Sequence, residues 1–403
     1  MILFRRVLGF AMLPVISALS ALVLLPMVTR YQGAAGWSSL ALGQSLGAVI
    51  SVIGGLAWPF IGGDRIARDS DKSNHSYIFM LAVCTRGLVT LAGLIIGTVF
   101  LIFLSPGPLV ATWLFMAGVA GNALTAAWFY AGTGSPSRLI VNEGIPRLLG
   151  YLASVPLLAI THDIFYYALM TFLAQLLTLA LNYCSAIGLT RPPRVSMREV
   201  SEELRGQAGG TLARVFIAIG RSGGPPIVAA INPDTLAIYS AMDSIYKAGY
   251  NATNFVPLGF VQWIGQAEDR RTKHRRIRIG VGLIAIVCVV GGVIWQIVGN
   301  LIVEFLYAGQ LDANPTRILL IGLAVFVLLF NFAIEMMVLV PLGLSDFMFK
   351  CQLAASAIGL ALFPILGRFG AESVFIISIV VPGITLTCYT IKIYLGTRGE
   401  SVY

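Results

Sequence analysis

Six ionisable residues lie deep inside apolar segments of this 403-residue chain. Four are basic, Arg86, Arg214, Arg221 and Lys247, and two are acidic, Asp243 and Glu335. A charge in hydrocarbon costs about 2.5 to 3.5 kcal/mol on insertion scales, so such residues usually face a cavity or an opposite charge. The excess of positive charge would attract an anion, and the arginine fork suits phosphate oxygens in particular. The four basic residues are therefore candidate ligands of an anionic cargo.

The spacing of these residues predicts which of them share a helix face. Asp243 and Lys247 are four residues apart, and Arg214 and Arg221 are two helical turns apart. An anionic cargo that took Lys247 from Asp243 would leave a carboxylate that tends to bind a proton. Asp243, together with Glu335, is thus a candidate for ion coupling. The structural alternatives are mutual neutralisation of Asp243 and Lys247 and, for the arginines, pairing with Glu335 or snorkelling, above all at Arg214.

The composition predicts that these residues sit on transmembrane helices. Hydrophobic residues make up 57% of the chain and charged residues 11%, whereas a soluble domain carries about 25% charged residues. Apolar runs predict an all-α membrane protein with twelve spans, at 7–29, 35–62, 77–104, 108–132, 148–161, 164–189, 208–231, 235–264, 279–306, 316–343, 351–367 and 373–391. The polar segment 190–207 would be a cytoplasmic linker between an N-terminal bundle (1–189) and a C-terminal bundle (208–403), and its second part is expected to form a short interfacial helix.

The distribution of basic residues predicts the orientation of the spans. With the N-terminus in the cytoplasm, most of the 27 lysines and arginines fall in cytoplasmic loops, as the positive-inside rule requires. Only Arg30, Arg317 and Arg368 then lie outside. Both termini are therefore expected to be cytoplasmic. The basic run 270–276 is interpreted as a topology anchor that contacts membrane lipid headgroups, with no nucleic-acid role.

The sequence lacks the motifs of several enzyme classes. It contains no GxxxxGK[ST] loop for ATP, no HExxH and no GxSxG, and its five cysteines form no CxxC pair. We expect no metal site, no cofactor and no enzyme activity. Any transport would be driven by an ion gradient or by the gradient of the cargo.

Two segments resemble a known family. The first hairpin, Leu22 to Ser45, places Pro26, Thr29, Arg30 and Gly33 in a Pro…Thr-Arg…Gly turn, and the segment AIYSAMDSIYK ends at Lys247. In both the chain resembles the Wzx-type polysaccharide flippases of the MOP superfamily, to which the MATE exporters also belong. The resemblance implies two six-helix bundles around a central cavity that opens alternately to either side. It also implies that Arg86, Arg221 and Lys247, with Arg214, would hold the diphosphate of the cargo.

The function expected from these observations is that of a flippase in the bacterial plasma membrane. It would move an oligosaccharide on undecaprenyl diphosphate, with H⁺ or Na⁺ as coupling ion and polysaccharide assembly enzymes as partners. One alternative is a MATE-like ion-coupled multidrug or small-molecule antiporter, which should have an acidic cavity. Another is a membrane glycosyltransferase or polysaccharide polymerase, which should carry a large extracytoplasmic loop.

Overall fold

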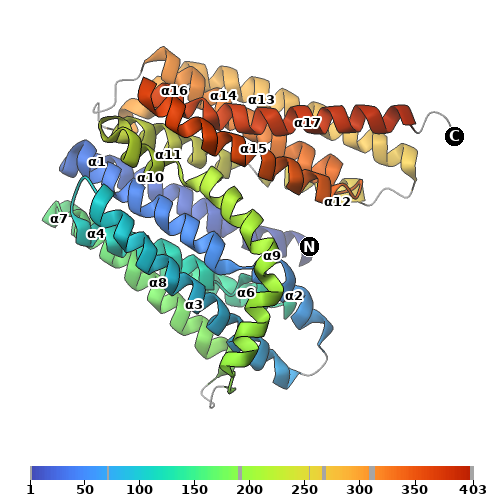
Figure 1. Cartoon of the computed structure of the whole chain (residues 1–403), viewed down its shortest axis with the longest axis horizontal. Coiled ribbons are helices and arrows are strands. Elements are labelled where there is room, and N and C mark those ends of the chain that lie inside the picture. The colour runs from blue at the N-terminus through green and yellow to red at the C-terminus, as the bar shows by residue number, and fades with distance from the viewer. Residues whose placement is uncertain are drawn as a thin grey trace. The chain divides into compact units, whose positions relative to one another are not determined.

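The computed structural model of the protein describes residues 2–69, 72–188, 193–253, 255–265, 269–307 and 314–399. Within these ranges every regular element is a helix, most of them α-helices and some single 3-10 or π-helical turns. The contacts divide the chain into two compact units, Met1–Ala230 and Ile231–Tyr403. Figure 1 labels the helices of each unit.

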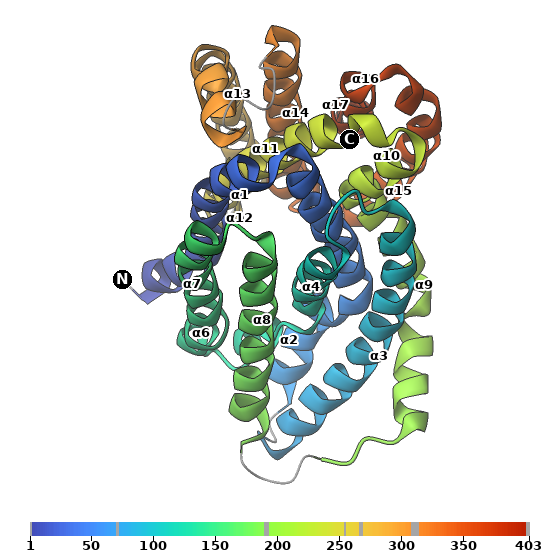
Figure 2. The ribbon, with the colours of Figure 1, turned by 90° about the vertical axis from the view of Figure 1, so that its left-hand side faces the viewer.

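Unit 1 is a bundle in which α1 packs against α3 and α4, and α8 lies between α4 and α7 (Figure 2). Its elements are α1 (Ile2–Gly55), α2 (Trp58–Arg68), α3 (Lys72–Leu104), α4 (Leu109–Ala120), η1 (Gly121–Leu124), α5 (Ala127–Gly132), α6 (Pro136–Leu139), η2 (Ile140–Gly144), α7 (Ile145–Thr161), α8 (Ile164–Ile187), α9 (Met197–Ser222) and α10 (Gly224–Ile231).

Unit 2 is a second helical bundle, built around α14. This helix packs against α11, α13 and α17, and α15 packs against α17. The elements of the unit are η3 (Pro233–Thr235), α11 (Leu236–Thr253), α12 (Phe255–Gly265), α13 (Arg270–Tyr307), α14 (Pro315–Ile334), η4 (Glu335–Leu339), α15 (Ser345–Leu366), η5 (Gly367–Phe369), α16 (Ala371–Phe375) and α17 (Ile377–Gly399).

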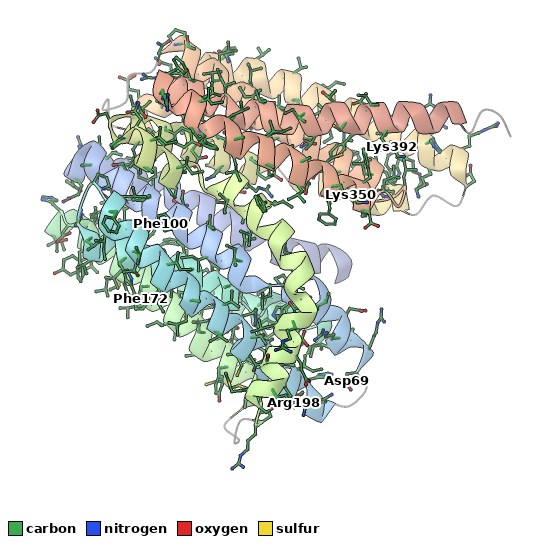
Figure 3. All side chains as sticks on the ribbon, in the orientation of Figure 1. Asp69, Phe100, Phe172, Arg198, Lys350 and Lys392 are labelled. Atoms are coloured by element: carbon green, nitrogen blue, oxygen red, sulfur yellow. The ribbon has the colours of Figure 1, made fainter. Side chains whose placement is uncertain are left out.

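Nine helical segments of the described chain are long and apolar enough to cross a membrane. They are Pro26–Gly55, Asn74–Leu104, Leu109–Gly132, Ser137–Thr161, Ile164–Ile187, Arg271–Tyr307, Pro315–Leu339, Ser345–Phe369 and Ala371–Ile393. Their outer faces are apolar: Phe100 on α3, labelled in Figure 3, is 49% exposed, and Ile297 on α13 is 71% exposed. Apolar surface of this extent belongs in lipid, so the all-α membrane fold is confirmed.

The predicted number of twelve spans stays a prediction. The segments 7–29, 208–231 and 235–264 are largely helical over their described residues, with a break at Gly223, but none of them is a separate member of the nine. Side chains before Pro26 and at 208–213 lie outside the described part, and so does part of segment 235–264.

Two helix breaks set the ends of the first two predicted spans. Gly33 has φ 64° and interrupts α1, which confirms the predicted hairpin turn. The predicted span 35–62 was too long, because its helix ends at Gly55 and Leu56 adopts φ 51°. Pro59 explains this end, since a proline donates no N–H and its ring clashes with the carbonyl four residues earlier.

The fifth predicted span, 148–161, was too short. The helical segment begins at Ser137 and passes through the π-helical turn η2 before α7. Pro146 follows η2 by two residues, and Pro341 follows the π-helical turn η4 by two residues as well. Because proline cannot complete the ordinary hydrogen bond, the preceding turn widens. The helix continues into α7 after η2, whereas it ends in a turn after η4. The predicted loop before residue 148 therefore lies largely inside the helical segment.

The predicted linker 190–207 is mostly the start of a long helix, although residues 190–192 lie outside the described chain. Ser196 and Glu199 form a capping box at the start of α9. The helix then runs on to Ser222 and joins the predicted seventh span, so the expectation of a short separate helix was wrong. Contacts with α1 and α3 place α9 in unit 1 (Figure 1). The division into six and six spans remains a prediction.

Candidate functional site

Arg86 on α3 is completely buried in unit 1. Its Nη1 donates to the carbonyls of Ala123 and Thr125 at 3.0 and 2.9 Å, and its Nε donates to the carbonyl of Ala82 at 3.1 Å. The guanidinium also lies 5.4 Å from the centroid of the Trp128 ring. Nη1 and Nε of Arg86 are thus turned to backbone carbonyls, whereas Nη2 is buried with no hydrogen-bond partner among the described residues. The expected role of Arg86 in cargo binding stays a prediction.

Glu143 in η2 is a buried carboxylate that lies beside the same break. It accepts hydrogen bonds from the Thr125 hydroxyl at 2.6 Å, the Ala126 N–H at 2.7 Å and Asn182 Nδ2 at 3.1 Å. Arg147 Nη2 lies 3.4 Å from it. Sequence reasoning assigned Glu143 to a loop and so missed it. The apolar residues on both sides of it were the signal that the helix continues through this position.

Asp243 and Lys247 form the predicted pair on α11. Lys247 Nζ lies 2.6 Å from Asp243 Oδ2, and the side chains are 31% and 8% exposed respectively. Tyr307 from α13 donates to the Ala241 carbonyl at 3.2 Å and fixes this part of α11. The pair thus consists of a buried acid and a partly exposed ammonium.

Glu335 opens the π-helical turn η4 and is 7% exposed. It accepts hydrogen bonds from Gln352 Nε2 on α15 at 2.7 Å and from the Tyr389 hydroxyl on α17 at 3.1 Å. These partners are uncharged donors from two neighbouring helices. The arrangement parallels that of Glu143, which is also a buried acid in a π-helical turn.

Arg214 on α9 lines a pocket of about 590 Å³ between α2, α3 and α9. The charged residues around it are mixed in sign: Arg65, Arg214, Glu199, Glu202 and Glu203. Arg65 pairs with Glu203 at 2.9 Å, so this pocket is not the basic cavity that the sequence predicted.

Arg221 lies in the last turn of α9 and is exposed. Arg198, at the start of the same helix, extends away from the ribbon (Figure 3) and pairs with Glu202 at 2.8 Å. Arg86, Arg214 and Arg221 therefore have three different environments within unit 1. Their convergence on one cargo stays a prediction.

The buried charges of the described helices are mostly acidic: Glu143, Asp243 and Glu335 are buried, and Arg86 is the buried base. Arg147 and Lys247 are partly exposed, at 23% and 31%. The described residues contain no cluster of His, Cys, Asp or Glu that could hold a metal ion. These side chains can pair with ions and accept protons, and they form no constellation for covalent catalysis.

The fold defined by these helices is that of the MATE transporters. A structure titled as an inward-facing conformation of a multidrug resistance MATE family transporter of the MOP superfamily matches with TM-score 0.63 and 12% identity, over 98% of both chains. The eukaryotic MATE transporter AtDTX14 matches with TM-score 0.63 and 12% identity, over 97% of this chain and 96% of that chain. No family model and no curated protein matches the sequence.

Proposed function

We propose that the protein is a membrane transporter that moves an undecaprenyl-diphosphate-linked oligosaccharide across the bacterial plasma membrane. The observation that carries the proposal is the Asp243–Lys247 pair within a MATE-type fold that extends over 98% of the chain. Lys247 supplies a positive charge, partly exposed, on a helix that sequence reasoning places at mid-depth in the membrane. Such a charge suits a diphosphate that must leave one membrane surface and reach the other.

Coupling to an ion follows from the same pair. A diphosphate that binds Lys247 removes the partner of Asp243, and the stranded carboxylate then favours proton binding because its surroundings are buried. Glu335 is a second coupling candidate, since it is a buried carboxylate that accepts hydrogen bonds from Gln352 and Tyr389. Arg86 is left out of the cargo site because it is completely buried and its Nη1 and Nε bind backbone carbonyls. Arg221 and Arg214 remain proposed cargo ligands on α9.

A MATE-like ion-coupled antiporter is the second candidate. Glu143, Asp243 and Glu335 are buried acids, whereas Arg86 is the one buried base among the described residues. An acidic interior favours a cationic cargo. The two candidates differ in the sign of the charge on the cargo, which makes them separable by experiment.

Purified protein in proteoliposomes provides the test. One assay follows a fluorescent undecaprenyl-diphosphate disaccharide, with the outer leaflet bleached by dithionite; the other follows ethidium under an imposed pH gradient. We expect movement of the lipid-linked sugar, lost in Lys247→Met, with protein-free vesicles as the control. Ethidium transport without lipid movement would replace the flippase proposal by the antiporter. Movement of neither would reject both.

A further inference from the structure

A smaller pocket lies inside unit 1, where α8 packs between α4 and α7. Its volume is about 100 Å³, which is room for several water molecules or for one small ion with water. Asn122, Arg147 and Gln175 provide polar lining. At about 1.5 Å per residue, Gln175 lies roughly 16 Å from the start of α8, in the middle of that span.

Three polar atoms at this pocket are buried without a hydrogen-bond partner among the described residues. They are Arg147 Nε, Gln175 Nε2 and Asn122 Oδ1. Gln175 is only 5% exposed. An unpaired buried donor costs about 1 to 3 kcal/mol, so such groups normally hold a ligand or ordered water. Arg147 and Gln175 supply donors, and the Asn122 amide supplies one as well if its oxygen and nitrogen are exchanged.

The charges around the pocket favour an anion over water alone. Arg147 pairs with the buried carboxylate of Glu143 at 3.4 Å, and Arg86 and Glu143 bind the backbone of the neighbouring residues Thr125 and Ala126, so two guanidinium groups lie near one carboxylate. Arg86 binds the carbonyl of Ala123, the residue after Asn122, so its charge belongs to the same region. One positive charge is left without compensation. No acidic residue lines the pocket.

Two glycines leave room for the pocket and for the Gln175 side chain beside it. Gly118 lines the pocket without a side chain. A Cβ on Gly121 would come within 2.5 Å of Gln175 Cγ, so a glycine at this position is needed for the Gln175 side chain to occupy its place beside the pocket.

We propose that this pocket binds a small monovalent inorganic anion of the chloride class, held by Arg147 Nε and Gln175 Nε2. The anion neutralises the residual charge of the Arg86–Glu143–Arg147 group and joins α4, α7 and α8. The inference does not depend on the proposed cargo, because the site lies within unit 1 and its occupancy can be measured without transport.

The test compares thermal unfolding of the full chain in sodium chloride and in sodium gluconate at equal ionic strength. At about ten times the dissociation constant, chloride should raise the midpoint by about 1.5 to 3 °C. Gln175→Glu places a carboxylate beside Arg147, so it should unfold in gluconate near the wild-type midpoint in chloride and show no chloride effect. Gln175→Leu should also lose the chloride effect, but its unfolding midpoint in gluconate should not rise.

The matched control is Gln44→Leu, since Gln44 is an exposed glutamine of α1 that does not line the pocket. It should keep the full chloride effect. Crystals grown in bromide should show an anomalous peak in the pocket. An equal midpoint in chloride and gluconate for the wild type, an unchanged chloride effect in Gln175→Glu, or a pocket that contains only water would each overturn the proposal.

Discussion

Arg86 and Glu143 bind opposite kinds of backbone group at one helix break, a carbonyl and an N–H. Arg86 Nη1 donates to the Thr125 carbonyl at 2.9 Å, and Glu143 Oε1 accepts from the N–H of the next residue, Ala126, at 2.7 Å. A break in a membrane helix leaves backbone groups that lipid cannot satisfy. Two charged side chains from α3 and η2 satisfy them here. We infer from this relationship that Arg86 stabilises the fold of unit 1.

Arg86→Met should destabilise the protein. The substitution leaves the carbonyls of Ala123 and Thr125 without this donor, and two unpaired buried groups cost about 2 to 6 kcal/mol. We expect a lower midpoint of thermal unfolding and less folded protein in detergent. Arg221→Met is the control, because Arg221 is exposed on α9. An unchanged midpoint in Arg86→Met would contradict the structural role.

The attachment of α9 should weaken in acid. Hydrogen bonds from the Ser196 backbone and hydroxyl and from the Tyr77 hydroxyl hold the pKa of Glu199 below its ordinary value of 4.5. A lowered pKa in the folded state means that this stabilisation is present above the ordinary value and is lost as the pH falls through the folded-state pKa.

The measurement is the unfolding midpoint from about pH 7 down to about pH 3. Glu199→Gln should lower the midpoint at neutral pH and reduce its acid dependence. Glu202→Gln is the control on the same helix, since its pair with Arg198 is exposed and contributes little. Identical acid profiles for the wild type and Glu199→Gln would show that the capping box does not titrate as described.

Asp243→Asn should uncouple transport from the proton gradient. The amide keeps the shape beside Lys247 but cannot titrate, so transport should continue with little dependence on an imposed pH gradient. The assay is cargo movement in vesicles with and without that gradient. Full gradient dependence in Asp243→Asn would exclude Asp243 as the coupling site and favour the pair as a static brace of α11.

Arg221→Ala should abolish transport and leave protein abundance near normal, because an exposed arginine in the last turn of α9 contributes little to folding. Arg214→Ala should reduce transport less, since Arg214 shares its pocket with Glu199, Glu202 and Glu203. Transport per folded protein is the quantity to compare. A stronger transport defect in Arg214→Ala would reverse the assigned order of the two residues.

The basic first turns of α13, which belong to the loop expected from the sequence, should face the cytoplasm. A single cysteine in place of Arg275, which is exposed, should resist an impermeant maleimide added to intact cells, whereas a cysteine at position 310 should react. The opposite labelling pattern would overturn the twelve-span topology.

The sequence by itself was enough for the class of fold and for one local pair. Apolar runs of membrane length reflect transfer into lipid, which depends on composition alone. The spacing of Asp243 and Lys247 sets their contact because both lie on one continuous helix, α11. The turn at Gly33 could also be predicted from the sequence, since a turn between two spans needs a residue that tolerates positive φ.

Only the tertiary structure decided what the other buried charges contact. Arg86 could have faced a cavity, and its carbonyl partners became evident only when the break after η1 was placed beside α3. Glu143 was hidden because the π-helical turn before Pro146 carries the helix through a segment that reads as a loop. Such contacts join residues 17 to 39 positions apart, so they depend on helix packing, which local patterns do not encode.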